Sequence, residues 1–299
     1  MKAFPSILET TQDLSRDQIE KLLSLAKNFK DGQDPLFFFK QNPPILSTLF
    51  LENSTRTKTS FAVAINKLGG HYIDFNVDTS SLKKGESLEE TLLTLKYQGI
   101  DICVIRTPNS NEFAPFKENP PIKIINGGDG VNHHPSQGLL DLFTFLDLGI
   151  DPKGKTMVVI GDILHSRVFN SLSDLFIRFG GKIIICGPKE CLPTSIEGVE
   201  VTDSLEDALA KADLIYTLRI QKERHAKPVA YYDTYAEKYG LNLKKLKNNI
   251  PVFHPGPVNI GVELSQEVLR SPHYQGYLQV KNSIYMRMAI ITAMIKYGS

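Results

Sequence analysis

A hydroxyl-rich turn between an apolar run and a helical pattern constrains the fold of this chain more than any other feature. The apolar run Ile45–Leu51 has the length of a buried strand, and apolar residues recur at helical spacing from Phe61 to Leu68. Between them lies the polar stretch Glu52–Thr59. A strand, a polar turn and a helix N-terminus therefore follow one another, and this succession is the repeating unit of an α/β fold.

The same turn is suited to an anion that carries several oxygens. Free backbone N–H groups and the positive end of the helix dipole point out of such a turn. Ser54, Thr55 and Thr57 add hydroxyl donors, and the planar guanidinium of Arg56 fits two phosphate oxygens. An ordinary helix cap beside a surface arginine is the simpler alternative, but this density of donors favours a phosphate site. The pattern GxxxxGK is absent from this turn, which disfavours a P-loop nucleotide triphosphatase.

Composition excludes several classes of protein. The chain has 299 residues, which suits two domains of about 150 residues each. Its net charge of +1 provides no general attraction for nucleic acid or a membrane, so an anionic ligand must meet locally gathered cations. Cys103, Cys186 and Cys191 form no CxxC pair, which indicates reduced thiols and disfavours a metal site. We expect a cytoplasmic protein, because the sequence shows neither an apolar signal core nor an apolar run near the ~18 residues of a membrane span.

The first half of the chain continues the alternation of helices and strands. Capping boxes at Ser15 and Ser87 start two helices, and strands are predicted at 71–75, 101–105 and 122–125. Between the first of these strands and the second helix lies a polar, basic loop that is too long for a tight turn.

Polar groups follow the carboxyl ends of three predicted strands, at the Ser54 turn, at Arg106 and near His134. In open α/β sheets ligands bind beyond these ends, so we expect Arg106 and the Ser54 turn to face one crevice. A lone histidine is more often structural than catalytic, but His134 lies between a glycine-rich strand end and a new helix start. We therefore interpret His134 as functional and the adjacent His133 as a bystander.

A turn after Gly149 suggests a domain boundary. We predict a first domain over 1–149, a second over 150–282, and a C-terminal helix over 283–299 that packs back on the first domain. Each domain is expected to be a mostly parallel sheet flanked by helices, which places the chain in the α/β class.

The second domain starts like a nucleotide-binding fold, with strands at 156–160 and 182–186. Gly161 stands alone after the first of these strands and no GxGxxG is present, so a dinucleotide site is disfavoured. Arg167 lies at a helix start, and Arg219 follows another predicted strand. Surface salt bridges are the simpler alternative for each arginine, but their shared position beyond strand ends favours a carboxylate site. A further strand that runs into a rigid turn is predicted within 252–258.

Taken in order, these motifs resemble the aspartate and ornithine carbamoyltransferases. The resemblance covers nearly the whole chain and rests on Ser54-Thr55-Arg56-Thr57, Lys83-Lys84-Gly85-Glu86, Arg106, His134-Pro135-x-Gln137, Gly161-Asp162 with Arg167, Arg219-x-Gln221-Lys222-Glu223-Arg224 and His254-Pro255-Gly256-Pro257. It implies transfer of a carbamoyl group from carbamoyl phosphate to the amino group of L-aspartate with release of phosphate, the committed step of pyrimidine synthesis. It implies a homotrimer and neither a cofactor nor a metal.

The resemblance also implies a role for each matching residue. Ser54, Thr55, Arg56 and Thr57 would bind the phosphate, together with Ser80 and Lys84 from a neighbouring subunit. Thr55, Arg106 and His134 would hold the carbonyl oxygen, and Gln137 the carbamoyl nitrogen. Arg167, Arg219, Gln221, Lys84 and the backbone of Gly256 and Pro257 would hold aspartate. The residues implied to act directly in catalysis are Thr55, Arg56, Lys84, Arg106 and His134.

Two alternatives remain open. An enzyme that uses ornithine would share the first half, but such enzymes carry a cysteine where this chain has Pro255-Gly256, and Gln221–Arg224 favour a dicarboxylate. An inactive scaffold subunit would require a broken site, whereas the motif positions are intact. Ile260 stands where the family pattern usually has arginine, which puts local contacts near the aspartate site in question. The sequence does not indicate whether a regulatory or pathway-enzyme partner exists.

Overall fold

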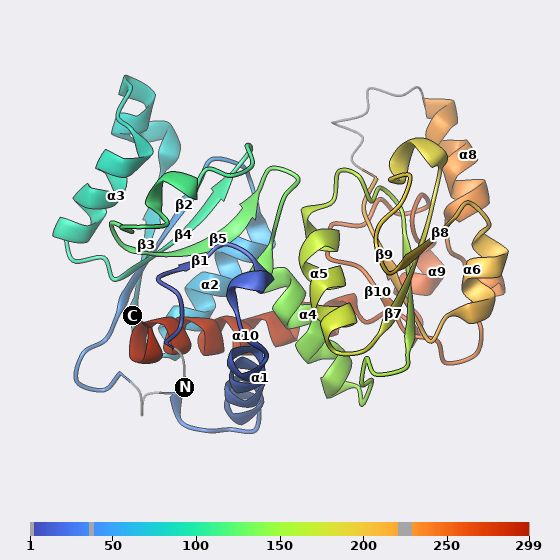
Figure 1. Ribbon diagram of the computed structural model, residues 1–299, viewed down its shortest axis with the longest axis horizontal. Helices are drawn as coiled ribbons and strands as arrows, with labels where there is room; N and C mark the ends of the chain where they lie inside the picture. The colour runs from blue at the N-terminus through green and yellow to red at the C-terminus, as the bar shows by residue number, and fades with distance from the viewer. Residues whose placement is uncertain (1–2, 36–38, 221–228, 299) are drawn as a thin grey trace. The chain divides into compact units, whose positions relative to one another are not determined.

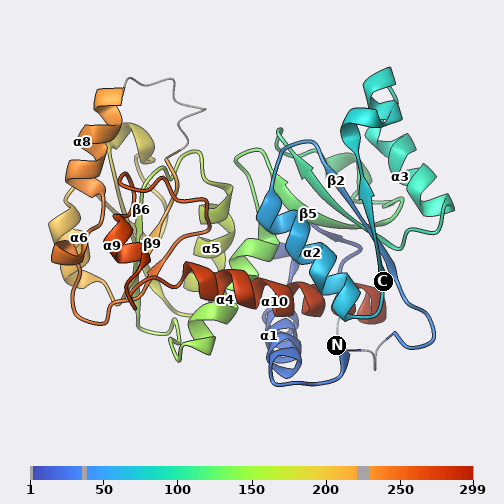
Figure 2. The same cartoon turned by 180° about the vertical axis from the view of Figure 1, so that it is seen from behind.

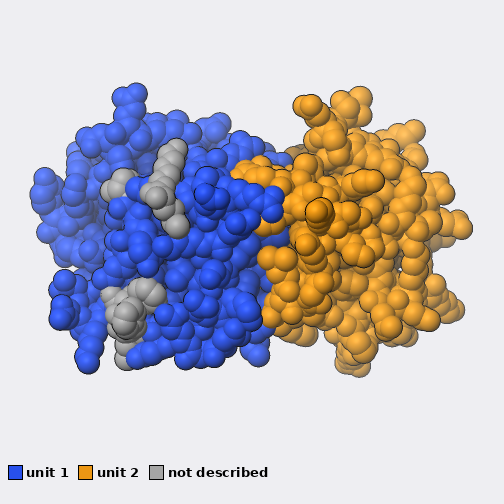
Figure 3. Space-filling view, turned by 60° about the horizontal axis from the view of Figure 1, so that its bottom comes forward, with its two compact units in different colours: residues 1–143, 170–172, 280–299 blue, residues 144–169, 173–279 orange. Residues whose placement is uncertain are grey.

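The computed structural model (Figure 1, and from behind in Figure 2) describes residues 3–35, 39–220 and 229–298. These residues fall into two compact units, which Figure 3 colours separately. The first unit comprises residues 1–143, 170–172 and 280–299, and the second comprises 144–169 and 173–279. The last twenty residues therefore belong to the same unit as the first residues of the chain.

The first unit is built on a five-stranded sheet in the order β1-β5-β4-β2-β3. Its strands pair in parallel and are β1 (Ile7–Leu8), β2 (Ile45–Phe50), β3 (His71–Phe75), β4 (Ile102–Thr107) and β5 (Lys123–Asp129). The chain adds β3 on one side of β2 and then returns to the other side for β4. The strand order reverses between β2 and β4, and the crevice at such a reversal is where open α/β sheets bind ligands.

Helices cover both faces of this sheet. They are α1 (Arg16–Lys30), α2 (Thr55–Lys67), α3 (Leu88–Tyr97), α4 (Pro135–Asp147, of which the part to residue 143 belongs to this unit) and α10 (Gly276–Tyr297, which joins the unit at residue 280). Short 3-10 turns lie at Thr11–Asp13, Val77–Thr79, Ser81–Lys84 and Ala114–Phe116. In Figure 1, α3 lies above the sheet and α1 and α10 lie below it; Figure 2 shows α2 close to α10. The capping boxes predicted at Ser15 and Ser87 are confirmed.

The apolar residues of the central strands form the core of the first unit. Leu92 and Leu95 of α3 pack with Leu49, Cys103 and Ile105 on one face of the sheet. Because helices cover both faces of the sheet, the central strand β4 begins with the buried apolar run Ile102 to Ile105, whereas the edge strand β3 is more polar and partly exposed.

The second unit has its own five-stranded parallel sheet in the order β10-β9-β6-β7-β8. Its strands are β6 (Thr156–Ile160), β7 (Lys182–Cys186), β8 (Val199–Thr202), β9 (Leu214–Thr217) and β10 (Val252–Phe253). Here the order reverses between β6 and β9. The two units therefore share one architecture, and the expected α/β class is confirmed.

The helices of the second unit pack on this sheet through aromatic and aliphatic side chains. They are α5 (Arg167–Arg178, apart from residues 170–172), α6 (Leu205–Lys211), α8 (Val229–Tyr239) and α9 (Gln266–Leu269), with 3-10 turns at Lys189–Cys191 and Leu243–Lys245. Three tyrosines of α8 lie in one cluster with Val158, Ile184 and Ile215 of the strands. No helix in the described part of the chain is long and apolar enough to cross a membrane.

Several element boundaries differ from the prediction. Within 252–258, the strand that was expected to run into a rigid turn is the short β10, which ends at Phe253 because Pro255 and Pro257 lack the N–H that a strand ladder needs. The strand expected over 122–125 continues to Asp129. The C-terminal helix expected from residue 283 begins at Gly276, where the exposed Tyr277 gives no apolar periodicity to read.

Candidate active site

The turn between β2 and α2 has the geometry of an anion site. Ser54 is the N-cap of α2, and its Oγ accepts the N–H of Thr57 at 3.4 Å. Thr55 and Arg56 are exposed in the first turn, whereas Thr57 is buried. The first turn of a helix carries N–H groups without intrahelical acceptors, and these remain available to a bound oxyanion.

An open cavity of about 970 Å³ adjoins this turn and is lined in part by Ser54 and Thr55. Its cations are already paired, because Lys58 Nζ lies 2.6 Å from an Asp74 oxygen and Lys83 Nζ lies 3.3 Å from an Asp78 oxygen. Of the other predicted phosphate ligands, Arg56 does not line this cavity in the described structure.

Ser80 and Lys84 lie on the loop that flanks this cavity, but neither lines it among the described residues. The hydroxyl of Ser80 donates to the Val77 carbonyl at 2.8 Å. Lys84 ends the 3-10 turn Ser81–Lys84 and is exposed.

Arg106 lies at the strand-order reversal and is held from two sides. Its Nε and Nη2 both lie 3.1 Å from Glu52 Oε2, and its Nη1 donates to the Gly127 carbonyl at 3.2 Å. The backbones of these two segments are also hydrogen-bonded, since the Leu51 N–H donates to the Arg106 carbonyl at 2.9 Å. Glu52 belongs to the stretch that opens the phosphate turn, so the structure brings Arg106 and this turn together.

His134 joins the same group of residues. Its Nε2 lies 3.4 Å from the Oγ1 of Thr57, in the first turn of α2. Its backbone N–H donates to the Oγ of Ser171 at 2.9 Å, and its side chain is 4% exposed. Three residues later, the buried Gln137 donates from Nε2 to Asp141 at 3.0 Å.

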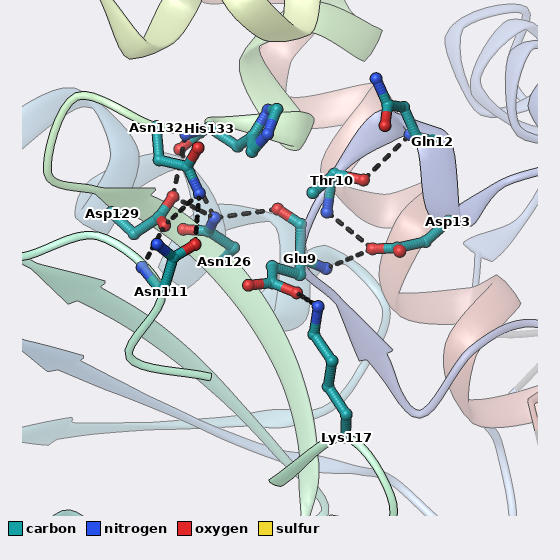
Figure 4. A network of polar contacts seen from close by, with 10 residues as sticks. All are labelled: Glu9, Thr10, Gln12, Asp13, Asn111, Lys117, Asn126, Asp129, Asn132 and His133. Atoms are coloured by element: carbon teal, nitrogen blue, oxygen red, sulfur yellow. Dashed lines mark hydrogen bonds and ion pairs between the residues drawn. The ribbon is translucent and has the colours of Figure 1, made fainter. Parts of the chain in front are cut away.

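A buried carboxylate shapes the loop that leads to His134 (Figure 4). Asp129 accepts hydrogen bonds from the Asn126 amide at 2.7 Å, the His133 N–H at 2.9 Å, the Asn132 amide at 3.0 Å and the Asn111 N–H at 3.2 Å. A buried charge is tolerated when donors surround it in this way. The network fixes the backbone immediately before His134, and it uses the N–H of His133, not its imidazole.

In the second unit, Gly161 and Asp162 connect β6 to α5. Gly161 has a φ of 132°, and a Cβ there would lie 2.7 Å from the Leu218 carbonyl oxygen, so glycine is required. The buried Asp162 accepts from the N–H of His165 at 3.3 Å and contacts its Nδ1 at 2.9 Å. This turn ends at Arg167, the half-buried first residue of α5.

Arg219 follows β9, the strand beside β6, and is half-buried. The buried Glu263 fixes the segment that starts at Arg219. Glu263 accepts the N–H of Ile220 at 2.9 Å and the N–H of Asn259 at 2.6 Å, and the Asn259 amide donates to the Ile220 carbonyl at 3.1 Å. Glu263 thereby ties the residue after Arg219 to the turn that follows Pro257.

The remaining predicted aspartate ligands are Gly256, Pro257 and Gln221. The Gly256 N–H donates to the His254 Nδ1 at 2.8 Å, and His254 is buried with its Nε2 3.8 Å from Glu263. The Gly256–Pro257 peptide is cis. Gln221 lies outside the described residues. Ile260 is 57% exposed.

Three polar residues that organise the site were missed by the sequence analysis: Asp129, Ser171 and Glu263. Each acts through a contact between segments that are distant or irregular, such as the bond between Ser171 and His134 across 37 positions. Local periodicity carries no signal for such contacts. In the part of the chain that the structure describes, no group of three or more His, Cys, Asp or Glu side chains lies close enough to hold a metal ion.

Comparison with known proteins agrees with this geometry. Residues 7–147 match the family model described as the aspartate/ornithine carbamoyltransferase carbamoyl-P binding domain, and residues 153–294 match the model of the Asp/Orn binding domain. The chain belongs to the aspartate/ornithine carbamoyltransferase family, as the motifs predicted.

Several similar relatives and solved structures are named as aspartate enzymes. The chain is 38% identical to the aspartate carbamoyltransferase catalytic subunit of Listeria welshimeri, over 98% of this chain and 96% of that one. It is 37% identical to that of Thermus thermophilus, over 94% of each chain. Among solved structures, it resembles the M. jannaschii aspartate transcarbamoylase catalytic subunit with a TM-score of 0.83, 29% identity and coverage of 97% and 98%. The Trypanosoma cruzi enzyme in complex with carbamoyl phosphate gives a TM-score of 0.82, 29% identity and coverage of 97% and 96%.

Proposed function

We propose that this chain is an aspartate carbamoyltransferase. It transfers the carbamoyl group of carbamoyl phosphate to the amino group of L-aspartate, giving N-carbamoyl-L-aspartate and phosphate, the committed step of pyrimidine biosynthesis. The observation that carries this proposal is the match of both halves of the chain to the two domains of the family, with near full-length relatives that are named as aspartate enzymes.

The first unit binds carbamoyl phosphate. Ser54, Thr55, Arg56 and Thr57 hold the phosphate, Thr55, Arg106 and His134 hold the carbonyl oxygen, and Gln137 holds the carbamoyl nitrogen. Two contacts support this assignment: Thr57 with His134, and Arg106 with Glu52 beside the phosphate turn.

The second unit binds L-aspartate. Arg167 and Arg219 pair with its carboxylates, with Gln221 and the backbone of Gly256 and Pro257 beside them. Support comes from the sheet, because both arginines follow the strands β6 and β9 between which the strand order reverses. We place the functional boundary near residue 149 and assign the helix 283–299 to the first domain.

Positioning and electrostatics account for the catalysis. The aspartate amine attacks the carbonyl carbon, negative charge grows on the carbonyl oxygen, and the donors Thr55, Arg106 and His134 stabilise that charge. Preorganised donors of this kind each lower the barrier by about 3 kcal/mol. The C–O bond to phosphate then breaks, and the departing phosphate accepts the amine proton, so no covalent enzyme intermediate or cofactor is needed.

The active sites are shared between subunits of a homotrimer. Ser80 and Lys84 of one subunit serve the phosphate turn of its neighbour, and Lys84 also contacts aspartate. The exposure of Lys84 and its absence from the lining of its own chain's cavity support this arrangement.

We also place the protein in the cytoplasm. The three cysteines are buried free thiols, which fits a reducing compartment.

A phosphate-release assay tests the proposed function. Purified protein receives carbamoyl phosphate with either L-aspartate or L-ornithine, and the product is identified by mass spectrometry. Phosphate release that depends on aspartate and yields N-carbamoyl-L-aspartate is the expected result. Citrulline from ornithine would favour the second branch of the family, and release with neither acceptor would favour an inactive subunit.

A further inference from the structure

A charged side chain lies in the core of the first unit, away from any role given above. Arg287 is on the C-terminal helix α10, and it is 2% exposed. Its Nη1 donates to the Oγ of Ser60 on α2, and its guanidinium carbon lies 4.8 Å from the centre of the Phe61 ring. In the described structure its Nε makes no hydrogen bond.

Burying this charge is unfavourable. Burial lowers the pKa of Arg287 to about 9, and the Asp141 carboxylate acts against that shift. The guanidinium therefore keeps its charge at neutral pH. Apolar side chains of similar size stabilise protein interiors as well as, or better than, buried ion pairs do. Core packing alone therefore does not account for an arginine here. Two polar neighbours do: the Ser60 hydroxyl, to which Arg287 donates, and the Asp141 carboxyl, whose charge attracts it.

The first neighbour, Ser60, lies directly beneath the phosphate turn. Its Oγ is within hydrogen-bonding distance of the carbonyls of Arg56 and Thr57. A hydroxyl has one proton and two lone pairs. Because Arg287 donates to a lone pair, the Ser60 proton is left to point at these carbonyls, which belong to the turn that carries the phosphate ligands.

The second neighbour, Asp141, sets the orientation of Gln137. The Gln137 amide presents its NH₂ group to the Asp141 carboxyl, with Nε2 3.0 Å from Oδ1. The amide oxygen of Gln137 then remains for a donor elsewhere. A carbamoyl NH₂ group is such a donor. The Arg287 charge attracts the Asp141 carboxylate that holds the Gln137 amide in this orientation.

We propose that Arg287 is a positioning residue for the carbamoyl-phosphate site, where one buried guanidinium orients both the Ser60 hydroxyl beneath the phosphate turn and, through Asp141, the Gln137 amide. The inference deepens the proposed function and rests on it for the identity of the ligand. Arg287 touches no substrate. Its effect is on the binding of the anion and of the carbamoyl group and not on aspartate.

The test compares three variants of the full-length protein. Arg287→Met keeps the length of the side chain and removes its donors and charge. Arg287→Lys restores the charge without the planar fork. Met294→Ala, which removes a buried side chain from the same helix, controls for simple loss of packing. For each we measure Tm, the Kd of inorganic phosphate by calorimetry, and the KM of both substrates with kcat.

The proposal expects Arg287→Met to raise the Kd of phosphate and the KM of carbamoyl phosphate about tenfold while the KM of aspartate changes less than twofold. Arg287→Lys recovers part of this loss. Met294→Ala lowers Tm and leaves the Kd of phosphate unchanged. An unchanged Kd in Arg287→Met, or an equal loss in Met294→Ala at a similar Tm, overturns the proposal.

If Arg287→Met does not fold, Ser60→Ala tests the proposal in its place. It removes the hydroxyl that links Arg287 to the turn, so the proposal expects it to weaken phosphate binding by itself, and unchanged binding counts against the link. Where both variants fold, the double variant should bind phosphate no worse than Arg287→Met alone.

Wild-type protein separates this inference from the proposed function. Wild-type protein that binds phosphate but transfers no carbamoyl group contradicts the proposed function, and the phosphate Kd values of the variants still decide the role of Arg287. Wild-type protein that does not bind phosphate at all overturns the role of Arg287 as well.

Discussion

Glu52 and Arg106 are paired at the point where the strand order of the first sheet reverses, with two guanidinium nitrogens 3.1 Å from one carboxylate oxygen. The Arg106 side chain is 12% exposed and that of Glu52 is 30% exposed. A third nitrogen of Arg106 is bonded to the Gly127 carbonyl. The pair therefore fixes the direction of an arginine that would otherwise turn towards any nearby anion.

Glu52→Gln should uncouple binding from catalysis. Loss of the negative charge leaves Arg106 less neutralised, so phosphate should bind about threefold more tightly, the equivalent of ~0.6 kcal/mol for a partly exposed pair. Loss of the fixed orientation should lower kcat at least about tenfold. Calorimetry and steady-state kinetics measure the two effects. Glu89→Gln, an exposed acid in the first turn of α3, serves as the control and should change neither.

His134→Ala should lower kcat about 100-fold with less than a twofold change in the KM of aspartate, because a donor to the carbonyl oxygen matters most as the oxyanion forms. The matched control is His133→Ala, since the structure uses only the backbone of His133 to hold Asp129. An unchanged kcat in His134→Ala would remove this residue from the oxyanion role.

Arg219→Ala should abolish the use of aspartate and leave the binding of carbamoyl phosphate nearly intact, because the two substrates are assigned to different units. Binding of each ligand is measured by calorimetry. Arg270→Ala, an exposed arginine after α9 in the same unit, should bind both ligands as the wild type does. Equal loss of both ligands in Arg219→Ala would contradict the division of labour.

The shared site makes a prediction about mixed oligomers. Arg56→Ala and Lys84→Ala should each be nearly inactive alone. A site that takes Arg56 from the Lys84 variant and Lys84 from the Arg56 variant is intact. In closed cyclic trimers formed by random equal mixing, about three quarters of the trimers are hybrids with one intact site each, so about a quarter of wild-type activity should return.

Native mass spectrometry confirms that hybrids have formed before activity is measured. The shared-site model would be contradicted if hybrids form and the activity stays at the level of the separate variants. Sites made within single chains predict that outcome.

The thiols of the folded protein should be unreactive. Burial raises the pKa of Cys103 to about 12, and burial together with Asp203 raises that of Cys186 to about 12. At pH 8 about one thiol in 10⁴ is then a thiolate, which is the reactive form. Ellman's reagent should therefore label all three cysteines only after denaturation. A Tyr97→Cys variant, at a position that is 85% exposed, checks that the reagent reacts under native conditions.

The sequence predicted those parts of the fold that local patterns determine. The predicted bounds are correct for three strands: His71–Phe75, Thr156–Ile160 and Lys182–Cys186. Each of them is short and follows a turn that contains glycine, so the local sequence marks where the strand begins. Strand β1 was missed. Ile7 and Leu8 form a strand only because Ile124 and Ile125 lie beside them, far along the chain.

The same limit applies to the candidate site. Ser54, Arg106 and His134 could be selected because each follows a strand end in a recognisable motif. Arg287 and Glu263 could not be selected in this way, because the partners of these buried side chains lie on segments that are distant in the sequence. Arg287 in particular lies on an apolar helix, where periodicity alone indicates core packing.

The closure of the first unit by the end of the chain has a consequence for biosynthesis. The N–H of Phe4 donates to the Tyr297 carbonyl at 2.9 Å, and residues 280–299 complete the unit that residues 1–143 begin. On the ribosome, residues 144–275 emerge before α10 does, so the second unit has almost all of its chain available while the first still lacks this helix. The phosphate turn is made early in translation, but the arginine beneath it arrives last. The first unit can therefore be completed only after the second unit has been synthesised.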